Sequence, residues 1–434
     1  MISFRQIAVV VSFLLVAVPA QAIEIKTVTS GKGITAWHVE DHTLPIITFS
    51  FAFKGGSVQD PADRQGISRL MASLMDEGAG DMDATAFQDK MEDLAMGFSF
   101  SSGRDDYFGS IRMLKGNRDA SLEMARLALN ETRFDEKPFN RIRDQFVAGI
   151  KASQNRPNRL AGIAMRKLIY PDNHPYQREQ GGTVESVSAI TIEDLRTLRA
   201  RLLARDNLIV SAVGAITEDE LKAALDLMFG ELPENADLTP IEKIEPTLGG
   251  EEAIDLPRPQ VQLSFVGKGI PRDDEDFMAA HIVNYILGGS GLTSRLSQEI
   301  REKRGLAYSV STGLSNNDFA NLFSGSVATR PNFADQTREV LDRELKRMGD
   351  EGPTAEELDL AKSFLIGAYA LNFDGSRSIA STLLALQMNG RPITYIDDRK
   401  NLIEAVDLEA AKRAAKRLLN DAEFAIVRVG PVTN

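Results

Sequence analysis

Residues 66–78, with the sequence GISRLMASLMDEG, carry the first clear helical pattern of hydrophobic positions. The apolar side chains recur at the i, i+3, i+4, i+7 and i+8 spacing, which places them on one stripe of an amphipathic helix. They are Ile67, Leu70, Met71, Leu74 and Met75. The neighbouring stripe carries Arg69, Ala72 and Ser73, at a spacing that lets a helix direct three side chains toward one point. None of these three is a good metal ligand, so the pattern predicts a helix that packs on the core.

Two longer patterns each occur twice along the chain. Windows 201–214 (RLLARDNLIVSAVG) and 417–430 (RLLNDAEFAIVRVG) both run from a helix into a β-rich segment that ends in glycine. A candidate helix N-cap, Thr191 or Asp407, lies ten residues before the first arginine of each window. The segments LPIITFSFAFKGGSV near residue 50 and RPQVQLSFVGKGIPR near residue 265 both show an alternating strand followed by a helix-rich stretch. Together these echoes predict two homologous, duplicated domains.

Each half mixes hairpin-like strands with amphipathic helices, so we expect an α+β fold in which helices pack on a mostly antiparallel sheet. Between the halves, residues 233–256 contain prolines, an adjacent pair of glycines and many acids, as interdomain linkers do. We therefore predict an N-terminal domain over residues 23–232 and a C-terminal domain over residues 257–434. The length of 434 residues agrees, because one hydrophobic core rarely serves so long a chain.

The first 22 residues, MISFRQIAVVVSFLLVAVPAQA, have the features of a secretory signal peptide. A basic residue, Arg5, precedes an apolar run over 7–18, and small residues flank a spacer at the end. We expect cleavage after Ala22 and export to the periplasm. No other run approaches the roughly 20 apolar residues that a membrane-spanning helix needs, so no membrane insertion is expected.

The composition is that of a globular protein, with 43% hydrophobic and 26% charged residues. The formal net charge of -12 argues against nucleic acid and anionic membranes as main partners, because both attract basic surfaces. Cysteine is absent, which excludes thiolate metal sites and thiol nucleophiles. Four imidazoles remain, and we expect a turn surface for His38 and His42 and structural roles for His174 and His281.

The run LGGSGLTSRLSQEIREKRGLAYSVS, residues 287–311, is the most informative stretch. A glycine-rich turn leads into a helix that we expect to end at Gly305 and to continue as a strand. Its expected inward-facing residues are Leu292, Leu296 and Ile300. Arg301 and Tyr308 then flank one helix-to-strand turn, which can bring a cation and a phenol to the same side. Both are strong hydrogen-bond donors, suited to the oxygen of a polarised peptide carbonyl or tetrahedral intermediate.

This run is similar to the C-terminal-domain signature of the pitrilysin, or insulinase-like, metallopeptidase family. The resemblance covers nearly the whole mature chain and includes HPYQREQGGTVESVSAIT at residues 174–191 and the hairpin before the opening helix. It implies two domains that form half of a clam-shell chamber. In that family an arginine and a tyrosine seven residues apart bind the substrate carbonyl, and Arg301 and Tyr308 match them.

The family also carries an inverted zinc motif, H-x-x-E-H, on its first long helix, and a further glutamate roughly eighty residues on completes the site. Aligned to that helix, this sequence has Arg69 and Ser73 at the histidine positions and Ala72 at the position of the base. The downstream ligand position falls at or near Gly149. The resemblance therefore implies a degenerate zinc site, with no metal bound to this chain.

The chain thus resembles the non-catalytic subunit of a two-chain bacterial peptidase. The implied activity is hydrolysis of peptides or unfolded protein segments by a heterodimer, in which a homologous partner holds Zn²⁺ and this chain donates Arg301 and Tyr308. Alone, the chain would be inactive.

Three alternatives stay open. Arg301 and Tyr308 could serve only as a helix-end ion-pair former and a strand aromatic. The protein could bind peptides or support assembly without hydrolysis, with an extended ligand added as a strand near GFSFSSG, residues 97–103. It could also be an autonomous hydrolase with a different mechanism.

Overall fold

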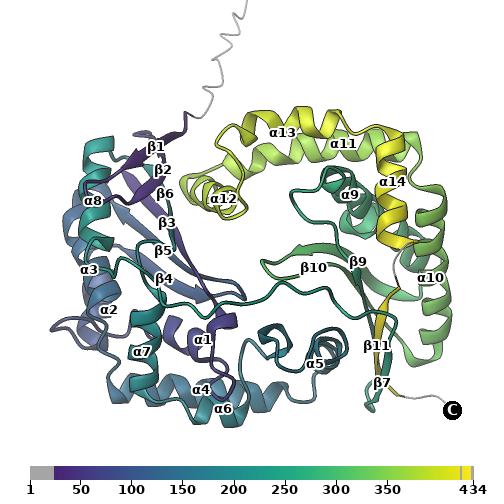
Figure 1. Cartoon of the computed structure of the whole chain (residues 1–434), viewed down its shortest axis with the longest axis horizontal. Helices are drawn as coiled ribbons and strands as arrows, with labels where there is room; N and C mark the ends of the chain where they lie inside the picture. The colour runs from purple at the N-terminus through teal and green to yellow at the C-terminus, as the bar shows by residue number, and fades with distance from the viewer. Residues whose placement is uncertain (1–23, 421–422, 432–434) are drawn as a thin grey trace, which may run out of the picture.

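The computed structural model describes residues 24–420 and 423–431, which fold into two sheets covered by helices (Figure 1). The predicted signal peptide, residues 1–22, lies outside the described residues. The first sheet has, in spatial order, β1 (Lys26–Thr29), β2 (Thr35–Glu40), β6 (Leu208–Gly214), β3 (Ile46–Lys54), β5 (Asp106–Leu114) and β4 (Gly97–Ser102). The second has β7 (Glu251–Asp255), β11 (Ala425–Gly430), β8 (Val261–Lys268), β10 (Asn321–Thr329) and β9 (Ala307–Asn316).

The two sheets repeat one topology. The order β2-β6-β3-β5-β4 of the first sheet corresponds to β7-β11-β8-β10-β9 of the second. In both, the first pair is parallel and the later pairs are antiparallel. The repeated windows end in β6 and β11, and the echoed hairpin segments form β3 and β8. The predicted α+β fold with duplicated, mostly antiparallel sheets is confirmed. Strand β7 begins at Glu251, inside the predicted linker of residues 233–256. The domain boundaries stay a prediction.

Helices follow the strands in both halves. In the first half they are α1 (Ile67–Ala72), α2 (Ala84–Asp93), α3 (Arg118–Asn130), α4 (Glu136–Ser153), α5 (Pro157–Ile169), α6 (Val184–Ser188), α7 (Ile192–Leu202) and α8 (Glu218–Phe229). In the second half they are α9 (Phe277–Asn284), α10 (Ala334–Glu351), α11 (Ala355–Tyr369), α12 (Ser376–Met388), α13 (Tyr395–Glu404) and α14 (Leu408–Leu419). Thr191 and Asp407 cap α7 and α14 through their side chains, as predicted.

The opening helix is shorter than its sequence pattern suggests. The pattern covers residues 66–78, but α1 ends at Ala72. The Ser73 hydroxyl donates to the Arg69 carbonyl at 3.2 Å, and the next amide, that of Leu74, donates to Met71 O at 2.9 Å in a tighter turn. The apolar stripe is nevertheless buried as predicted, because the turns after α1 continue to face the core.

Each sheet is covered on one face by a helix from the other half of the chain (Figure 1). Helix α5 packs on β8 and β11 of the second sheet, and α12 packs on β3 and β6 of the first. The α12 contact is a small apolar cluster of Ile379, Ala380 and Leu383 with Val39 and Val213. The α5 contact is larger and includes Ala161, Ala164, Met165, Ile169, Val266, Val427 and Val429. The two halves therefore bury hydrophobic surface against each other in both directions.

Loops at the tips of the two sheets are also tied together. Asp105, before β5, accepts the amide hydrogen of Asp318 at 3.1 Å and the Tyr176 hydroxyl hydrogen at 2.7 Å. The same Tyr176 oxygen accepts the amide hydrogen of Phe319 at 3.1 Å. Lys54 at the end of β3 lies 3.1 Å from the Asp318 carboxylate. These bonds fix the β9–β10 hairpin of the second half against the first half.

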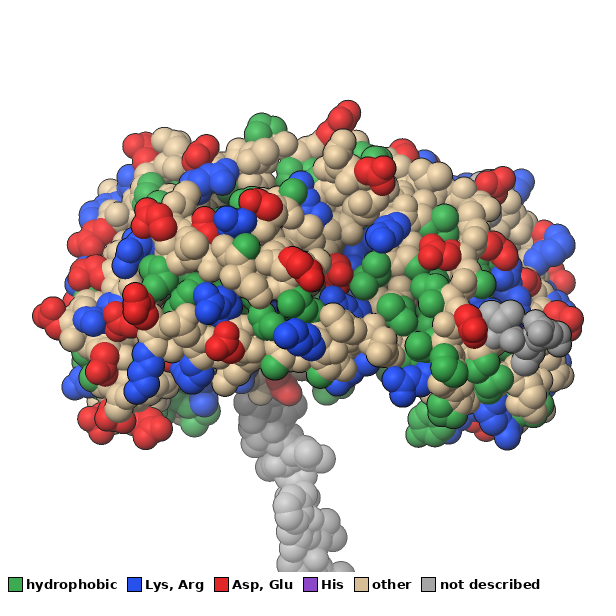
Figure 2. All heavy atoms as spheres, turned by 90° about the horizontal axis from the view of Figure 1, so that it is seen from below, with side chains coloured by type: hydrophobic (Ala, Val, Ile, Leu, Met, Phe, Trp, Pro, Cys, Tyr) green, Lys and Arg blue, Asp and Glu red, His purple; other side chains and the backbone are tan. Residues whose placement is uncertain are grey.

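Acidic and basic side chains are interspersed over the face of the molecule shown in Figure 2. No helix within residues 24–420 and 423–431 is long and apolar enough to cross a membrane.

We predict that Leu383→Ala loosens the contact between α12 and the first sheet. Leu383 is fully buried, so its truncation leaves a cavity and should lower the free energy of unfolding by about 2–5 kcal/mol. Trp37, the single tryptophan, packs against this cluster, so its fluorescence during urea unfolding reports the change.

Leu360→Ala on α11 is the matched control. Leu360 is 65% exposed, and its truncation should change the free energy of unfolding by no more than about 0.5 kcal/mol. Equal effects of the two substitutions would contradict a stabilising role for the α12 contact.

Candidate functional site

The turn that carries Arg301 and Tyr308 is built on a π-helical segment, Ser297–Glu302. Such segments are rare and occur often at functional sites. Gly305 ends it with a φ of +61°, a left-handed conformation that favours glycine, as predicted. The amide of Gly305 donates to Arg301 O at 2.9 Å, and the amide of Leu306 donates to Ile300 O at 2.9 Å. The chain then enters β9 directly.

The predicted inward-facing residues of this segment are only partly confirmed. Leu296 and Ile300 are fully buried. Leu292 is 55% exposed, and its predicted inward position is wrong. The reason is that Leu292 belongs to a separate 3-10 turn, Gly291–Thr293, rather than to the helix that follows.

Arg301 and Tyr308 lie together on the surface. The guanidinium carbon of Arg301 is 4.9 Å from the centroid of the Tyr308 ring. Tyr308 is 82% exposed and lies on β9, at the edge of the second sheet. Arg301 also pairs with Glu302, with 3.3 Å between Nε and Oε1. The turn thus presents a cation and an open phenol side by side, which is the arrangement that the spacing suggests.

Glu299 braces the turn from inside. Its side chain is 10% exposed and accepts hydrogen bonds from Lys303 at 2.5 Å and from Arg304 at 2.6 Å. Arg304 also donates to the Glu299 carbonyl at 2.8 Å. The hydrogen bonds from Lys303 and Arg304 lower the pKa of Glu299 to about 2. The Glu299 carboxylate therefore fixes the positions of Lys303 and Arg304, the two basic residues that directly follow the π-helical segment.

The four positions of the degenerate zinc site do not suit a zinc ion. Arg69 and Gly149 line one cavity of about 510 Å³, whereas Ala72 and Ser73 are not among its lining residues. A guanidinium, a methyl group, a hydroxyl and a glycine offer none of the imidazole or carboxylate ligands that zinc sites use. Among the residues that the structure describes, no group of three or more His, Asp or Glu could hold a metal ion.

The same cavity gathers residues that the sequence reading missed. Arg159 and Arg166 of α5 line it, together with Glu179. Arg159 donates to Glu179 at 2.6 Å and to the Ile150 carbonyl at 3.1 Å. Burial lowers the pKa of Arg166, and the nearby Arg104 adds to the effect. The spacing of seven residues places Arg159 and Arg166 on the same face of one helix, so the sequence could have predicted that they lie close together. The position of Arg69 beside them could not be predicted, because Arg69 lies on a different helix.

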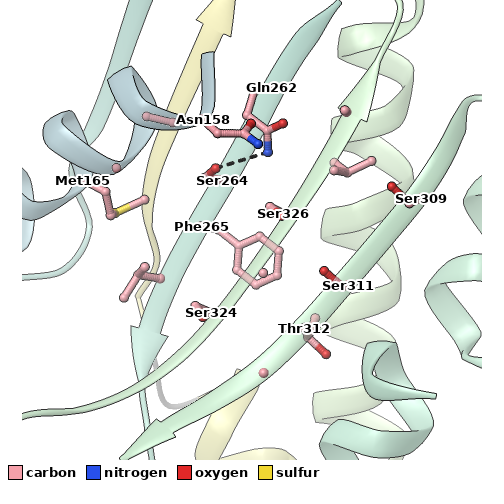
Figure 3. Close-up of a pocket in the computed structure, with 17 residues that line it drawn as sticks. Asn158, Met165, Gln262, Ser264, Phe265, Ser309, Ser311, Thr312, Ser324 and Ser326 are labelled. Atoms are coloured by element: carbon pink, nitrogen blue, oxygen red, sulfur yellow. Dashed lines mark hydrogen bonds between the residues drawn. The ribbon is translucent and has the colours of Figure 1, made fainter. Parts of the chain in front are cut away.

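A second cavity, of about 660 Å³, lies between α5 and the second sheet (Figure 3). Hydroxyl groups line the sheet face, from Ser264, Ser309, Ser311, Ser324 and Ser326. Gln262 Nε2 lies 3.5 Å from Ser264 Oγ, and Asn158 projects from α5 at the same end. No charged side chain is among its lining residues. Asn158 and Gly162 line both cavities, so the two adjoin along α5.

The histidines are not part of either cavity's lining. The predicted turn position of His38 is wrong, because β2 extends past it and buries it completely, and burial lowers its pKa. The side chain of His42 is 46% exposed in the following turn. His174 has a structural role, since its Nδ1 accepts the Tyr176 amide hydrogen at 3.1 Å. His281 lies on α9, where burial lowers its pKa.

Sequence comparison places these features among metallopeptidase relatives. The family model described as Peptidase M16 inactive domain matches residues 189–365, which include Arg301 and Tyr308. The non-peptidase homolog YmxG of Helicobacter pylori is 24% identical over 394 residues, which cover 89% of this chain and 90% of that protein. An uncharacterized zinc protease of Mycobacterium leprae is 30% identical over 293 residues, 67% of this chain and 65% of that protein.

Solved structures share the fold. A peptidase M16 inactive domain from Pseudomonas fluorescens matches with a TM-score of 0.88 at 28% identity, over 95% of this chain and 98% of that chain. The periplasmic protease PqqL from Escherichia coli matches with a TM-score of 0.81 at 14% identity, over 100% of this chain and 49% of that chain, which shows the fold alone.

Fold and comparisons together define a two-sheet α+β protein with an M16-like fold. The chain contains a match to the Peptidase M16 inactive domain over residues 189–365, and the resemblance to pitrilysin-like enzymes is confirmed.

We predict that Glu299→Gln destabilises the turn, because the neutral amide loses two charge-assisted hydrogen bonds. The free energy of unfolding should fall by about 1–3 kcal/mol at neutral pH. The folded pKa of about 2 lies below the ordinary value of 4.5, so the wild-type carboxylate stabilises the fold above pH 4.5 and loses this effect as the pH falls toward 2. Urea unfolding at several pH values measures the difference between the two proteins.

Glu339→Gln on α10 removes one exposed carboxylate from a helix and serves as the control. If it destabilises as much as Glu299→Gln, or if the effect of Glu299→Gln is the same at pH 3 and pH 7, the bracing role is wrong.

Proposed function

We propose that this protein is the zinc-free subunit of a heterodimeric periplasmic metallopeptidase and that Arg301 and Tyr308 act in the partner's catalytic site. The observation that carries the proposal is the contact between the half-buried Arg301 and the exposed Tyr308, on a chain whose residues at the expected metal positions are not zinc ligands. The predicted signal peptide at residues 1–22 supports export to the periplasm.

The positions of the two residue sets favour action on another chain. Arg301 and Tyr308 are not among the lining residues of the cavity that holds Arg69 and Gly149. The phenol of Tyr308 instead points to solvent from an edge strand. A substrate bound to a neighbouring subunit could reach this pair without entering the chain's own cavities.

The chemistry assigned to this chain is the binding of a carbonyl oxygen. The Tyr308 hydroxyl and the Arg301 guanidinium would donate hydrogen bonds to the oxygen of the scissile peptide bond and to the negative charge that develops on it. The stacking of Arg301 on the ring and its pairing with Glu302 hold the cation in place before substrate arrives. The zinc ion and the attacking water would come from the partner.

We predict that the purified chain cleaves peptides only after it is mixed with an exported M16 subunit that has an intact H-x-x-E-H motif. In the mixture, Arg301→Ala or Tyr308→Phe should lower kcat by roughly 100- to 1000-fold, because each removes a donor to the developing oxyanion. Steady-state kinetics with a fluorogenic peptide measure kcat, and gel filtration checks that the heterodimer still forms.

Arg143→Ala is the matched control. Arg143 also stacks on an aromatic ring, with 5.0 Å between its guanidinium carbon and the Phe139 centroid, but it lies on α4 in the other half of the chain. Its removal should leave kcat unchanged. Full activity of the Arg301→Ala and Tyr308→Phe mixtures would reject the donor role.

A second candidate function, peptide binding or assembly without hydrolysis, is favoured by one observation. Residues of GFSFSSG form β4, which lies at the open edge of the first sheet. An extended peptide can add to such an edge through main-chain hydrogen bonds. A homodimer that binds peptides and has no effect on cleavage by any zinc-containing homologue would support this function over the first.

A further inference from the structure

The cavity at the degenerate zinc site is strongly basic. Three arginines, Arg69, Arg159 and Arg166, are among its lining residues, and Glu179 is the single acid among them. Formal charges therefore sum to +3 - 1 = +2 in a chain whose net charge is -12. Glu179 is already engaged by Arg159 at 2.6 Å. Glu179 also acts on Arg166 at longer range, but no ion pair joins Arg69 or Arg166 to a carboxylate among the described residues that line this cavity.

Arg69 and Arg166 keep donors available. Within the described part of the chain, the Arg69 guanidinium makes no hydrogen bond or ion pair, and its carbon lies 5.8 Å from the centroid of the Phe146 ring. One of its terminal nitrogens lies 2.9 Å from where a Cβ of Gly181 would be, so the missing side chain at that position makes room for it. Arg166 uses its Nε to donate to the Gln177 carbonyl at 3.3 Å, which leaves its two terminal nitrogens.

We propose that this cavity binds the carboxylate of a peptide. A planar guanidinium presents paired N–H groups that match the two oxygens of a carboxylate, and the half-buried Arg166, which has no direct ion pair within the described chain, gains most from such a ligand. The amide side chains of Gln145, Asn158 and Gln180 also line the cavity and suit a peptide main chain. This site is formed by the chain's own residues and does not depend on the donor role of Arg301 and Tyr308.

The adjoining cavity gives the rest of such a peptide a place to lie. Asn158 and Gly162 border both spaces, and beyond them the serine hydroxyls of β8, β9 and β10 face an uncharged cavity (Figure 3). Hydroxyl groups both donate and accept hydrogen bonds, so they can pair with main-chain groups of varied sequences. The basic cavity lined by Arg69, Arg159 and Arg166 would hold the peptide's carboxylate, and the hydroxyl-lined cavity would hold the residues of the peptide next to it.

The test measures peptide binding to the lone mature chain by fluorescence anisotropy, so that no partner and no cleavage are involved. Three peptides carry an N-terminal fluorophore. Two share one sequence without Asp or Glu, as the free acid and as the C-terminal amide, and the third is the amide with one internal residue replaced by Glu. We expect the free acid to bind about tenfold or more tightly than the amide, because the charge-assisted hydrogen bonds are lost.

The third peptide distinguishes the two sources of a carboxylate. Recovery of binding with the internal Glu assigns the site to any peptide carboxylate, and no recovery assigns it to the C-terminus; both results support the proposal. Equal binding of the free acid and the amide would overturn it. Inorganic phosphate is the competitor in a parallel titration, and a site that binds phosphate but does not distinguish the acid from the amide is a general anion site, which also overturns the proposal.

Variants link the binding to the cavity. Arg69→Ala should weaken binding of the free acid about tenfold and leave the weak binding of the amide unchanged. Because Arg69 is exposed, this change should not disturb folding, and thermal unfolding checks that point. Lys167→Ala removes the same charge from an exposed position on α5 and should have no effect. Equal losses in Arg69→Ala and Lys167→Ala would show that overall charge, rather than this cavity, attracts the peptide.

Discussion

The reciprocal packing of α5 and α12 is the contact on which the arrangement of this molecule depends. Each helix belongs to one half of the chain and covers the sheet of the other half. The hydrogen bond that Asp105 accepts from the amide of Asp318, in the loop after β9, adds a directional contact to this hydrophobic burial. As a result α5, which carries Arg159 and Arg166, is held at a fixed position over the sheet that presents Tyr308. The two cavities that α5 lines depend on this packing for their geometry.

The fold was largely predictable because its signals are local. Alternating strands, the caps Thr191 and Asp407, and the buried stripe of the opening helix follow from side-chain periods and from hydrogen bonds within one turn. The packing of α5 and α12 on the sheets of the opposite halves was not predictable, because an apolar helix face does not specify which sheet it will cover. The exposed position of Leu292 was missed for a similar reason, since a π-helical segment and a 3-10 turn share the composition of an α-helix.

The candidate site was predictable in part. Arg301 and Tyr308 are seven residues apart across one turn, so their proximity is a local consequence of the sequence. The basic cavity joins Arg69, Arg159 and Glu179 from three separate segments, and only the tertiary structure brings them together. Its charge also opposes metal binding. The guanidinium groups of this cavity repel a divalent cation, and its one carboxylate, Glu179, is already paired with Arg159.

We propose that this chain cannot hold the ion that drives hydrolysis and supplies only hydrogen-bond donors to a reaction centre on another subunit. The most direct test is the zinc content of the isolated, tag-free mature chain after equilibration with excess zinc and dialysis, measured by inductively coupled plasma mass spectrometry. We expect dialysis to remove the zinc and the lone chain to cleave no peptide. Stoichiometric zinc that survives dialysis, together with peptide cleavage by the lone chain that a chelator abolishes, would contradict it.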